Sequence, residues 1–395
     1  MTFVHYDIIF IIVPGDYLHA MKEAHVPFGY SETWEAEMGE VWNIYQVSPH
    51  HSANQERAER DPVRLGIIGT GGVSQGKHLP SLNRLKTIGD PVEIVAVADV
   101  DEETGEKAAD IYDTEFYEDY ETMIDEEDLD GVDVTTPSGI SGPIVRDVLE
   151  EDCHVFREKP LYYQGLDDLD ETIDVAREVC EIADERDLVL MTGFCKRYAP
   201  PYANAKAIVE DGDIGDPAMI SGKMVQSWTG DRLFEEQACH LIDLFRYFMG
   251  DVSSVFTKGV DKYGVEDYDV DNAIINFEFE DGSIGELTTN NTSPVLKPWE
   301  RLEVYGDGAY LRVEDAEELS LYDDEEGPTK SWSPAPPNTL LWDEEFGGYV
   351  WELENFIQAI RGNEEPMVDG WDGLAALEVA RAAHESIETG EEIQL

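Results

Sequence analysis

The stretch that most constrains the fold is RLGIIGTGGVSQG, residues 64–76, in which an apolar run leads into a glycine-rich turn. The run favours a strand covered on both faces, and a helix is expected over 73–85. Glycines let the backbone pass close to a pyrophosphate, and the free N–H groups of a helix N-terminus attract its charge. Ser74 stands where the G-x-G-x-x-G pattern has its third glycine. We predict that the turn binds a dinucleotide through Gly69, Thr70, Gly71, Gly72 and Val73.

A second apolar segment, residues 93–98, ends on Asp99 and supports this interpretation. In dinucleotide-binding folds, an acidic residue about 20 positions after the turn accepts hydrogen bonds from the adenosine ribose. Asp99 lies further along the chain, and a loop over 86–91 accommodates the difference. Its carboxylate would repel a 2′-phosphate, and no arginine follows in residues 100–103. NAD is therefore expected in preference to NADP, which stays the alternative. The competing interpretation is an ordinary acidic residue at a strand end.

Strands and helices alternate from residue 64 onward, which predicts an α/β fold with a doubly wound parallel sheet. Strands are expected over 64–68, 93–98, 132–135, 154–157 and 189–192, and helices over 73–85, 104–111, 120–124, 142–150 and 166–184. Past residue 193 most predicted elements are hairpin strands, over 218–228, 253–258, 271–279, 284–290, 302–305 and 310–313. Helices are expected there over 200–209, 237–249, 349–360 and 371–388, and a loop over 323–337.

The chain thus divides into three predicted parts. Residues 62–193 form a Rossmann domain that binds NAD(P). Residues 194–395 form a substrate-binding and oligomerisation α/β domain with a large open, mostly antiparallel sheet. Residues 1–61 precede the first strand without sustained periodicity, and we expect an extension outside both domains, which is either a genuine segment or the result of an over-long translation start.

Acidic residues far outnumber basic ones, 87 against 27, and the formal net charge is −60. Such self-repulsion destabilises a compact chain at low ionic strength, and salt screens it. Because the acidic residues are spread over the whole chain, they predict a halophilic protein from a salt-rich, haloarchaeal cytoplasm. The same charge disfavours nucleic acid and anionic membranes as partners.

Cysteine and histidine placement indicates neither a disulfide framework nor a metal site. The four cysteines have no paired spacing. Residues 1–61 hold five of the nine histidines, but the adjacent pair His50 and His51 is poor chelating geometry. The longest apolar run there, residues 8–13, is too short for a signal sequence or a membrane span. We therefore expect a cytoplasmic protein without a bound metal.

Polar segments follow two predicted strands of the first domain, at the edge where parallel sheets bind ligands. The residues expected to contact the cofactor there are Thr136, Pro137, Ser138, Ser141, Glu158 and Lys159. Lys159 carries the chemistry, because an ammonium at this edge can steady the alkoxide that precedes hydride loss. The alternative is a surface lysine paired with Glu158.

The segment EEQACHLID, residues 235–243, supplies a second candidate group, His240. On a helix, Glu236 is four residues before His240 and Asp243 three after it, so one face would hold all three. A histidine oriented by carboxylates titrates near neutrality and can take the hydroxyl proton. The alternative is a helix-face histidine that its neighbours satisfy, and the lack of a second histidine nearby argues against a metal site.

Together these residues resemble the glucose–fructose oxidoreductase, inositol 2-dehydrogenase and rhizopine-catabolism (Gfo/Idh/MocA) family of NAD(P)-dependent oxidoreductases. The resemblance runs from about residue 63 to the C-terminus. The motifs that carry it are GIIGTGGVSQGKHLP, AVADVD, DVTTPSGISGPIV, HVFREKPL, GFCKRYAP, EQACHLIDLFRYFMGD, YGDGAYL and DGLAALEVARAAHES.

The resemblance implies a Rossmann domain, an α/β substrate domain, and a homo-oligomer, either a dimer or a tetramer. It implies a sugar, polyol or inositol as substrate, Lys159 as the catalytic lysine and His240 as the proton acceptor. Lys196 and Arg197, with Tyr198 beside them, fall where the family contacts its substrate. The Lys159–Pro160 bond is expected to be cis.

Four positions depart from the family pattern and leave the substrate open. Glu236 replaces the usual aspartate, Ser138 an asparagine, Ser141 a histidine and Ala238 a glycine. Two other functions use the same fold: a glycosidase that employs NAD transiently, and a non-catalytic dinucleotide-binding regulator. The presence of both Lys159 and His240 argues against the regulator.

Overall fold

The computed structural model describes residues 61–165, 169–225, 232–263, 270–292, 298–323, 330–332 and 348–395. The expected N-terminal extension lies outside these residues, apart from its last one. The start of the helix expected at 166 and the end of the strand expected at 228 lie outside them as well.

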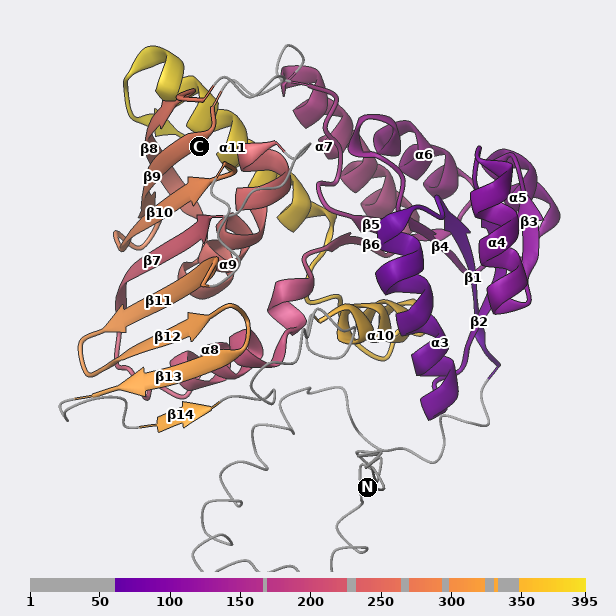
Figure 1. Ribbon diagram of the computed structural model, residues 1–395, viewed down its shortest axis with the longest axis horizontal. Coiled ribbons are helices and arrows are strands. Elements are labelled where there is room, and N and C mark those ends of the chain that lie inside the picture. The colour runs from indigo at the N-terminus through magenta and orange to yellow at the C-terminus, as the bar shows by residue number, and fades with distance from the viewer. Residues whose placement is uncertain are drawn as a thin grey trace, which may run out of the picture. The chain divides into compact units, whose positions relative to one another are not determined.

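The first sheet of the described chain has six strands in the order β3-β2-β1-β4-β5-β6, and all of its pairs are parallel (Figure 1). This confirms the doubly wound prediction. The strand order reverses between β1 and β4, which is where such sheets open a ligand crevice. The strands are β1 (Val63–Ile68), β2 (Val92–Ala98), β3 (Glu115–Tyr117), β4 (Gly131–Val134), β5 (His154–Glu158) and β6 (Leu190–Gly193).

Helices cover both faces of this sheet. One buried cluster joins the sheet to α3, α4 and α10, and a second joins it to α5, α6 and α7. Local capping fixes where some of these helices begin, since the Asp101 carboxylate accepts from the Thr104 N–H at the start of α4. The bounds are η2 (Ser74–His78, a π-helical turn), α3 (Leu79–Ile88), α4 (Glu102–Tyr112), α5 (Tyr120–Glu126), α6 (Ser138–Glu150), α7 (Leu169–Arg186) and α10 (Tyr349–Ile360).

The second sheet has nine strands within the described residues, in the order β14-β13-β12-β11-β7-β10-β9-β8-β15 (Figure 1). Only the pair β7–β10 is parallel among these strands, so the sheet is mixed and mostly antiparallel, as predicted. The strands are β7 (Pro217–Val225), β8 (Val252–Val260), β9 (Asn272–Phe279), β10 (Ile284–Asn290), β11 (Glu300–Gly306), β12 (Tyr310–Glu314), β13 (Glu318–Tyr322), β14 (Lys330–Trp332) and β15 (Ile393–Gln394).

The loop prediction over 323–337 is wrong at Lys330–Trp332, which is a strand. It pairs with β13, opposite Leu319 and Leu321. A three-residue edge strand is too short to show an alternating pattern in the sequence, so its pairing partner decides its structure.

The remaining helices belong to the second half of the chain. They are η4 (Cys195–Tyr198, a 3₁₀ turn), α8 (Pro200–Glu210), η5 (Leu233–Ala238, a π-helical turn), α9 (Cys239–Met249) and α11 (Gly370–Thr389). The expected helix over 237–249 therefore has a π-helical start that begins four residues earlier.

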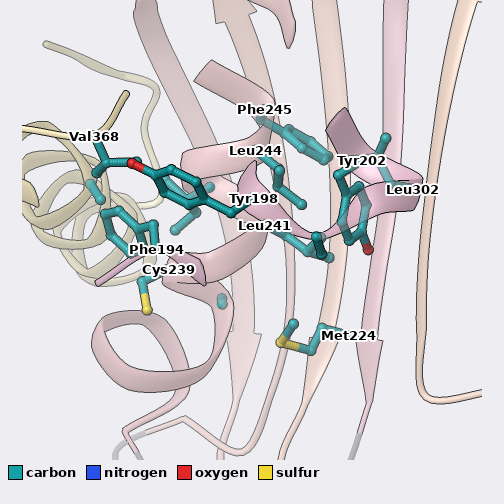
Figure 2. Packing of buried hydrophobic residues seen from close by; sticks show 14 of the residues in the cluster. Phe194, Tyr198, Tyr202, Met224, Cys239, Leu241, Leu244, Phe245, Leu302 and Val368 are labelled. Atoms are coloured by element: carbon teal, nitrogen blue, oxygen red, sulfur yellow. The ribbon is translucent and has the colours of Figure 1, made fainter. Parts of the chain in front are cut away.

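The apolar face of α9 anchors it on the second sheet. Leu241, Leu244 and Phe245 are fully buried and pack toward Met224 and Leu302 of the sheet (Figure 2). A Cβ on Gly222 of β7 would lie 2.8 Å from the Phe245 ring, so the strand must carry glycine where the helix crosses it. This packing fixes the start of α9, and with it His240, relative to the sheet.

Candidate active site

The glycine-rich turn follows β1 and has the shape that a pyrophosphate requires. Gly69 has a φ of 90°, and a Cβ there would lie 3.1 Å from the Thr135 backbone. A Cβ on Gly71 or Gly72 would meet no atom within 4 Å. The turn is therefore tight against the protein at its start and open beyond it, before the helix N-terminus. These residues fit the diphosphate of NAD.

Asp99 closes this turn from the neighbouring strand. Its Oδ2 accepts from the Thr70 N–H at 2.6 Å and from the Thr70 hydroxyl at 2.8 Å. Its Oδ1 accepts from the Asp101 N–H at 2.9 Å. The carboxylate is half-buried at the end of β2, which is the predicted place for a ribose-binding acid.

The segment after β4 joins the turn to the second half of the chain. The Thr135 hydroxyl donates to the Gly69 carbonyl at 2.6 Å. Ser138 Oγ donates to Glu236 Oε1 at 3.0 Å. Thr136 Oγ1 is buried and has no hydrogen-bond partner among the described residues, so it is available to a ligand.

Ser141 does not lie as predicted. It is fully buried in α6, and its hydroxyl donates to the carbonyls of Ser138 and Leu161 at 3.0 and 3.1 Å. The helix begins at Ser138, so one turn later the chain faces the protein interior. Ser141 therefore stabilises the loop through these two hydrogen bonds, and its buried side chain is not placed to contact a cofactor.

Lys159 follows β5, and its Nζ donates to the Glu236 carbonyl at 2.8 Å. The Lys159–Pro160 bond is cis, as the resemblance implied. Glu158, one residue earlier, is buried. Burial alone would raise the pKa of Glu158, but the nearby His78 ring and the charges of Lys159 and Arg157 lower it.

His240 lies in the first turn of α9, with its ring edge-on to Phe194 at 6.3 Å between centroids. Its Nδ1 is buried and has no hydrogen-bond partner in the described part of the chain. Burial and the charges of Lys159 and Lys196 hold the pKa of His240 well below its usual value. The imidazole is therefore neutral at pH 7 and able to accept a proton.

The carboxylates predicted to orient His240 do not contact it. Glu236 Oε2 accepts from the Arg232 N–H at 3.2 Å, and its other oxygen accepts from Ser138. The prediction assumed an α-helix, whereas residues 233–238 are π-helical, so positions four apart lose their alignment. Asp243 is fully buried and instead accepts from Arg197 at 2.5 and 2.9 Å.

The three residues expected to contact the substrate are held by other side chains. Lys196 Nζ lies 2.5 Å from Glu300 Oε2 and over the Trp299 ring. Arg197 also pairs with Asp372 at 2.9 Å, so its guanidinium joins η4 to α9 and α11. The Tyr198 hydroxyl donates to Asn355 Oδ1 at 2.8 Å. These bonds tie Arg197 and Tyr198 into the fold, whereas the charge of Lys196 also acts on the pKa of His240.

Sequence reasoning missed a buried charged cluster under the site. It contains His78, Asp133 and Arg157, each no more than 1% exposed. Arg157 donates to the Val134 carbonyl at 3.0 Å, and burial lowers its pKa to about 10. The available signal was the presence of a carboxylate and a guanidinium inside two strands that otherwise read as fully buried.

The described residues contain no group of three or more His, Cys, Asp or Glu side chains that could hold a metal ion. No helix among them is long and apolar enough to cross a membrane.

Known proteins share both halves of this architecture. Residues 63–194 match the oxidoreductase family with an NAD-binding Rossmann fold, and residues 206–395 match that family's C-terminal alpha/beta domain. Myo-inositol 2-dehydrogenase of Thermotoga maritima is 28% identical over 350 residues, 84% of this chain and 98% of that protein. The scyllo-inositol 2-dehydrogenase (NAD(+)) of Bacillus subtilis is 26% identical over 361 residues, 84% of this chain and 96% of that protein.

Among solved structures, levoglucosan dehydrogenase in complex with NADH and L-sorbose has the same fold. Its TM-score is 0.73 at 20% identity, over 85% of this chain and 99% of that one. With both domains matched in order, the chain belongs to the Gfo/Idh/MocA family of oxidoreductases and has its NAD-binding Rossmann fold.

Proposed function

We propose that the protein is an NAD-dependent dehydrogenase that oxidises a secondary alcohol of a sugar, polyol or inositol. The observation that carries the proposal is the nearness of Lys159, which follows β5, to the start of α9, where His240 lies. The Lys159 ammonium donates a hydrogen bond to the backbone carbonyl of Glu236, four residues before His240. Its charge also lowers the pKa of His240. The family relatives that act on inositols support the substrate class.

Each group has a distinct task in this reaction. Bound NAD supplies the hydride acceptor. The Lys159 ammonium donates a hydrogen bond to the reacting oxygen and stabilises the negative charge that develops there. The neutral His240 ring accepts the hydroxyl proton. Glu236 is a positioning residue, because its carbonyl holds Lys159 and its carboxylate holds Ser138.

The preference for NAD rests on Asp99. Its carboxylate lies beside the turn and is held by Thr70, where a 2′-phosphate would meet a negative charge. The next residue, Val100, is 96% exposed and offers no cation. Gly69, Gly71, Gly72 and Val73 would hold the diphosphate, and Thr136, whose hydroxyl has no hydrogen-bond partner among the described residues, would offer it to the cofactor.

The test is formation of reduced nicotinamide by the purified protein in molar KCl. NAD and NADP are each offered with aldoses, polyols, inositols and their phosphates. Turnover with one class of alcohol is the expected result. No turnover in the panel, with release of an aglycone from a glycoside and no net reduced nicotinamide, would replace the proposal with a glycosidase. NAD binding without either reaction would indicate a regulator.

Lys159→Ala is expected to lower kcat by about 10²- to 10³-fold, because the developing charge loses its donor. NAD affinity, measured by calorimetry, should change little. Lys206→Ala is the matched control, since Lys206 Nζ also donates to a backbone carbonyl, that of Tyr247, at 2.8 Å. Equal rates for the two variants would remove Lys159 from the mechanism.

We also propose a homo-oligomer that forms through the outer face of the second sheet. Met219, Ile274 and Ile284 are between 39% and 53% exposed on that face. Tyr310 stacks between Tyr305 and Tyr322, with centroids 5.2 and 4.5 Å apart. Light scattering in molar KCl measures the number of chains, and a single chain would contradict this proposal.

A further inference from the structure

His78 lies between two carboxylates, and no step proposed above uses it. Its Nδ1 is 2.8 and 3.1 Å from the two oxygens of Asp133. Its Nε2 is 3.6 Å from Glu158 Oε1. The side chains of His78 and Asp133 have no exposed surface, so water does not screen this row of charges.

This placement makes His78 an imidazolium and Glu158 a carboxylate. Burial alone would lower the pKa of His78, but Asp133 and then Glu158 raise it to about 10. The interaction is reciprocal, since the His78 ring, 3.6 Å from Glu158 Oε1, lowers the pKa of Glu158 against the effect of its burial. Both groups are therefore charged at neutral pH.

Three other titratable side chains around this row carry no charge at neutral pH. Burial raises the pKa of Glu352 well above its usual value, and both of its oxygens lack hydrogen-bond partners among the described residues. Burial also raises the pKa values of Tyr349 and Cys195, so all three groups are neutral. Two cations remain beside Glu158, namely Arg157 and Lys159.

His78, Asp133 and Glu158 come from three elements that each lead to a different part of the site. His78 ends η2, the turn that follows the phosphate-binding glycines. Asp133 belongs to β4, which leads into Thr135 and Thr136, and Glu158 directly precedes Lys159. The His78 ring therefore links the turn that follows the glycine-rich segment to the strand that precedes Lys159.

We infer that His78 is a positioning residue, whose imidazolium keeps Glu158 ionised beside Lys159 and so holds the lysine ammonium where the reacting oxygen binds. The inference rests on the proposed function, which makes Lys159 catalytic. A protonated Glu158 would no longer attract the ammonium, and turnover would fall although the fold persisted.

The test is the pH dependence of kcat for His78→Gln. Loss of the imidazolium raises the pKa of Glu158, so the acid limb of the profile should move up by about 1 to 2 pH units. Turnover near pH 6 should then fall about tenfold or more, and it should recover near pH 9, where Glu158 is ionised again. KM for NAD should stay within about threefold, because the glycine turn is unchanged.

His154→Gln is the matched control. His154 lies at the other end of β5, where its Nδ1 accepts from the Val189 N–H at 2.9 Å. This control makes the same substitution at the opposite end of the strand that carries Glu158, away from the site, and the acid limb of its pH profile should stay where it is. A loss of turnover in His78→Gln that is uniform over the pH range would show a purely structural role and overturn the inference.

A second measurement needs neither substrate nor a stable variant. ¹⁵N NMR of histidine-labelled protein should show one ring with both nitrogens protonated at pH 8, titrating only near pH 10. No such ring would overturn the inference whatever the activity. A charged His78 in a protein without dehydrogenase activity would instead contradict the proposed function, and the positioning role would fall with it.

Discussion

Single residues in this site obtain their chemical state from burial and from the charges around them. His240 is neutral because it is desolvated beside two ammonium groups, whereas His78 is charged because carboxylates flank its ring. The two histidines thus have opposite protonation states at neutral pH although they are the same type of residue. Distance to carboxylates decides between them, and that distance is a property of the fold.

Cofactor preference can be tested at one residue and its neighbour. Asp99→Ser with Val100→Arg removes the carboxylate and adds a guanidinium at an exposed position. The ratio of kcat/KM for NADP to that for NAD should rise by about tenfold or more, since an arginine can make charge-assisted hydrogen bonds to the 2′-phosphate. Serine still offers Thr70 one acceptor, so the turn should persist.

Val100→Arg alone is the control for this pair of substitutions, because it keeps the repulsive carboxylate. Its effect on the NADP ratio should be smaller than that of the double variant. A double variant with an unchanged ratio would place the ribose site away from Asp99.

At the scale of the elements, an ionic network fixes η4 against two helices. Arg197 pairs with Asp243 of α9 and Asp372 of α11, and Arg246 pairs with Asp372 at 3.0 Å. Burial raises the pKa of Asp243 to about 6, although Arg197 opposes this shift. The network holds α9, and therefore His240, in place without touching the ring.

Asp243→Ala should therefore act on stability rather than on chemistry. Leaving the Arg197 guanidinium with one carboxylate fewer is expected to cost about 3 kcal/mol of unfolding free energy in urea titrations. The kcat of the folded variant should stay within about threefold of the original. Asp251→Ala is the control, since Asp251 is the exposed partner of Arg246 and should cost less than about 1 kcal/mol. A stable Asp243→Ala variant without turnover would contradict this prediction and show that Asp243 takes part in the reaction.

The elements were more predictable than their contacts. Alternation of apolar segments marks β1, β2, β4 and β5, because both faces of a parallel sheet are covered. The strand β14 has no such signal and exists through its partner β13. The π-helical turn at Leu233–Ala238 could not be predicted from the spacing of residues in the sequence, so the prediction that Glu236 orients His240 was wrong.

The same limit applies to the site. Gly69, Asp99 and Lys159 were predicted as site residues because each follows a strand end, and a parallel sheet gathers such ends at one edge. Arg197 was assigned to the substrate because nothing in the sequence shows that Asp243 and Asp372 reach it from two helices. Pairings between distant segments depend on tertiary packing, which local patterns do not encode.

For the whole molecule, the dominant property is the net charge of −60. Several of the basic residues lie in the interior, among them Arg157, Lys196 and Arg197. The surface therefore carries the excess acid with few cations to offset it. Mutual repulsion of these carboxylates opposes the folded state, and it weakens as the Debye length falls from about 10 Å at 0.1 M salt to about 3 Å at 1 M.

Thermal stability should accordingly rise with salt. The unfolding midpoint is expected to increase by about 10 °C between 0.1 and 2 M KCl, since a gain of a few kcal/mol has that effect in a chain of this size. Scanning calorimetry measures the midpoint, and sucrose is the control, because it favours compact states without screening charge. An equal rise in sucrose, or a flat response to KCl, would show that repulsion between surface carboxylates is offset within the fold. The side chains of His78 and Asp133 have no exposed surface and that of Glu158 is only 10% exposed, so dissolved ions screen this row little and the pKa of His78 should not follow the salt concentration.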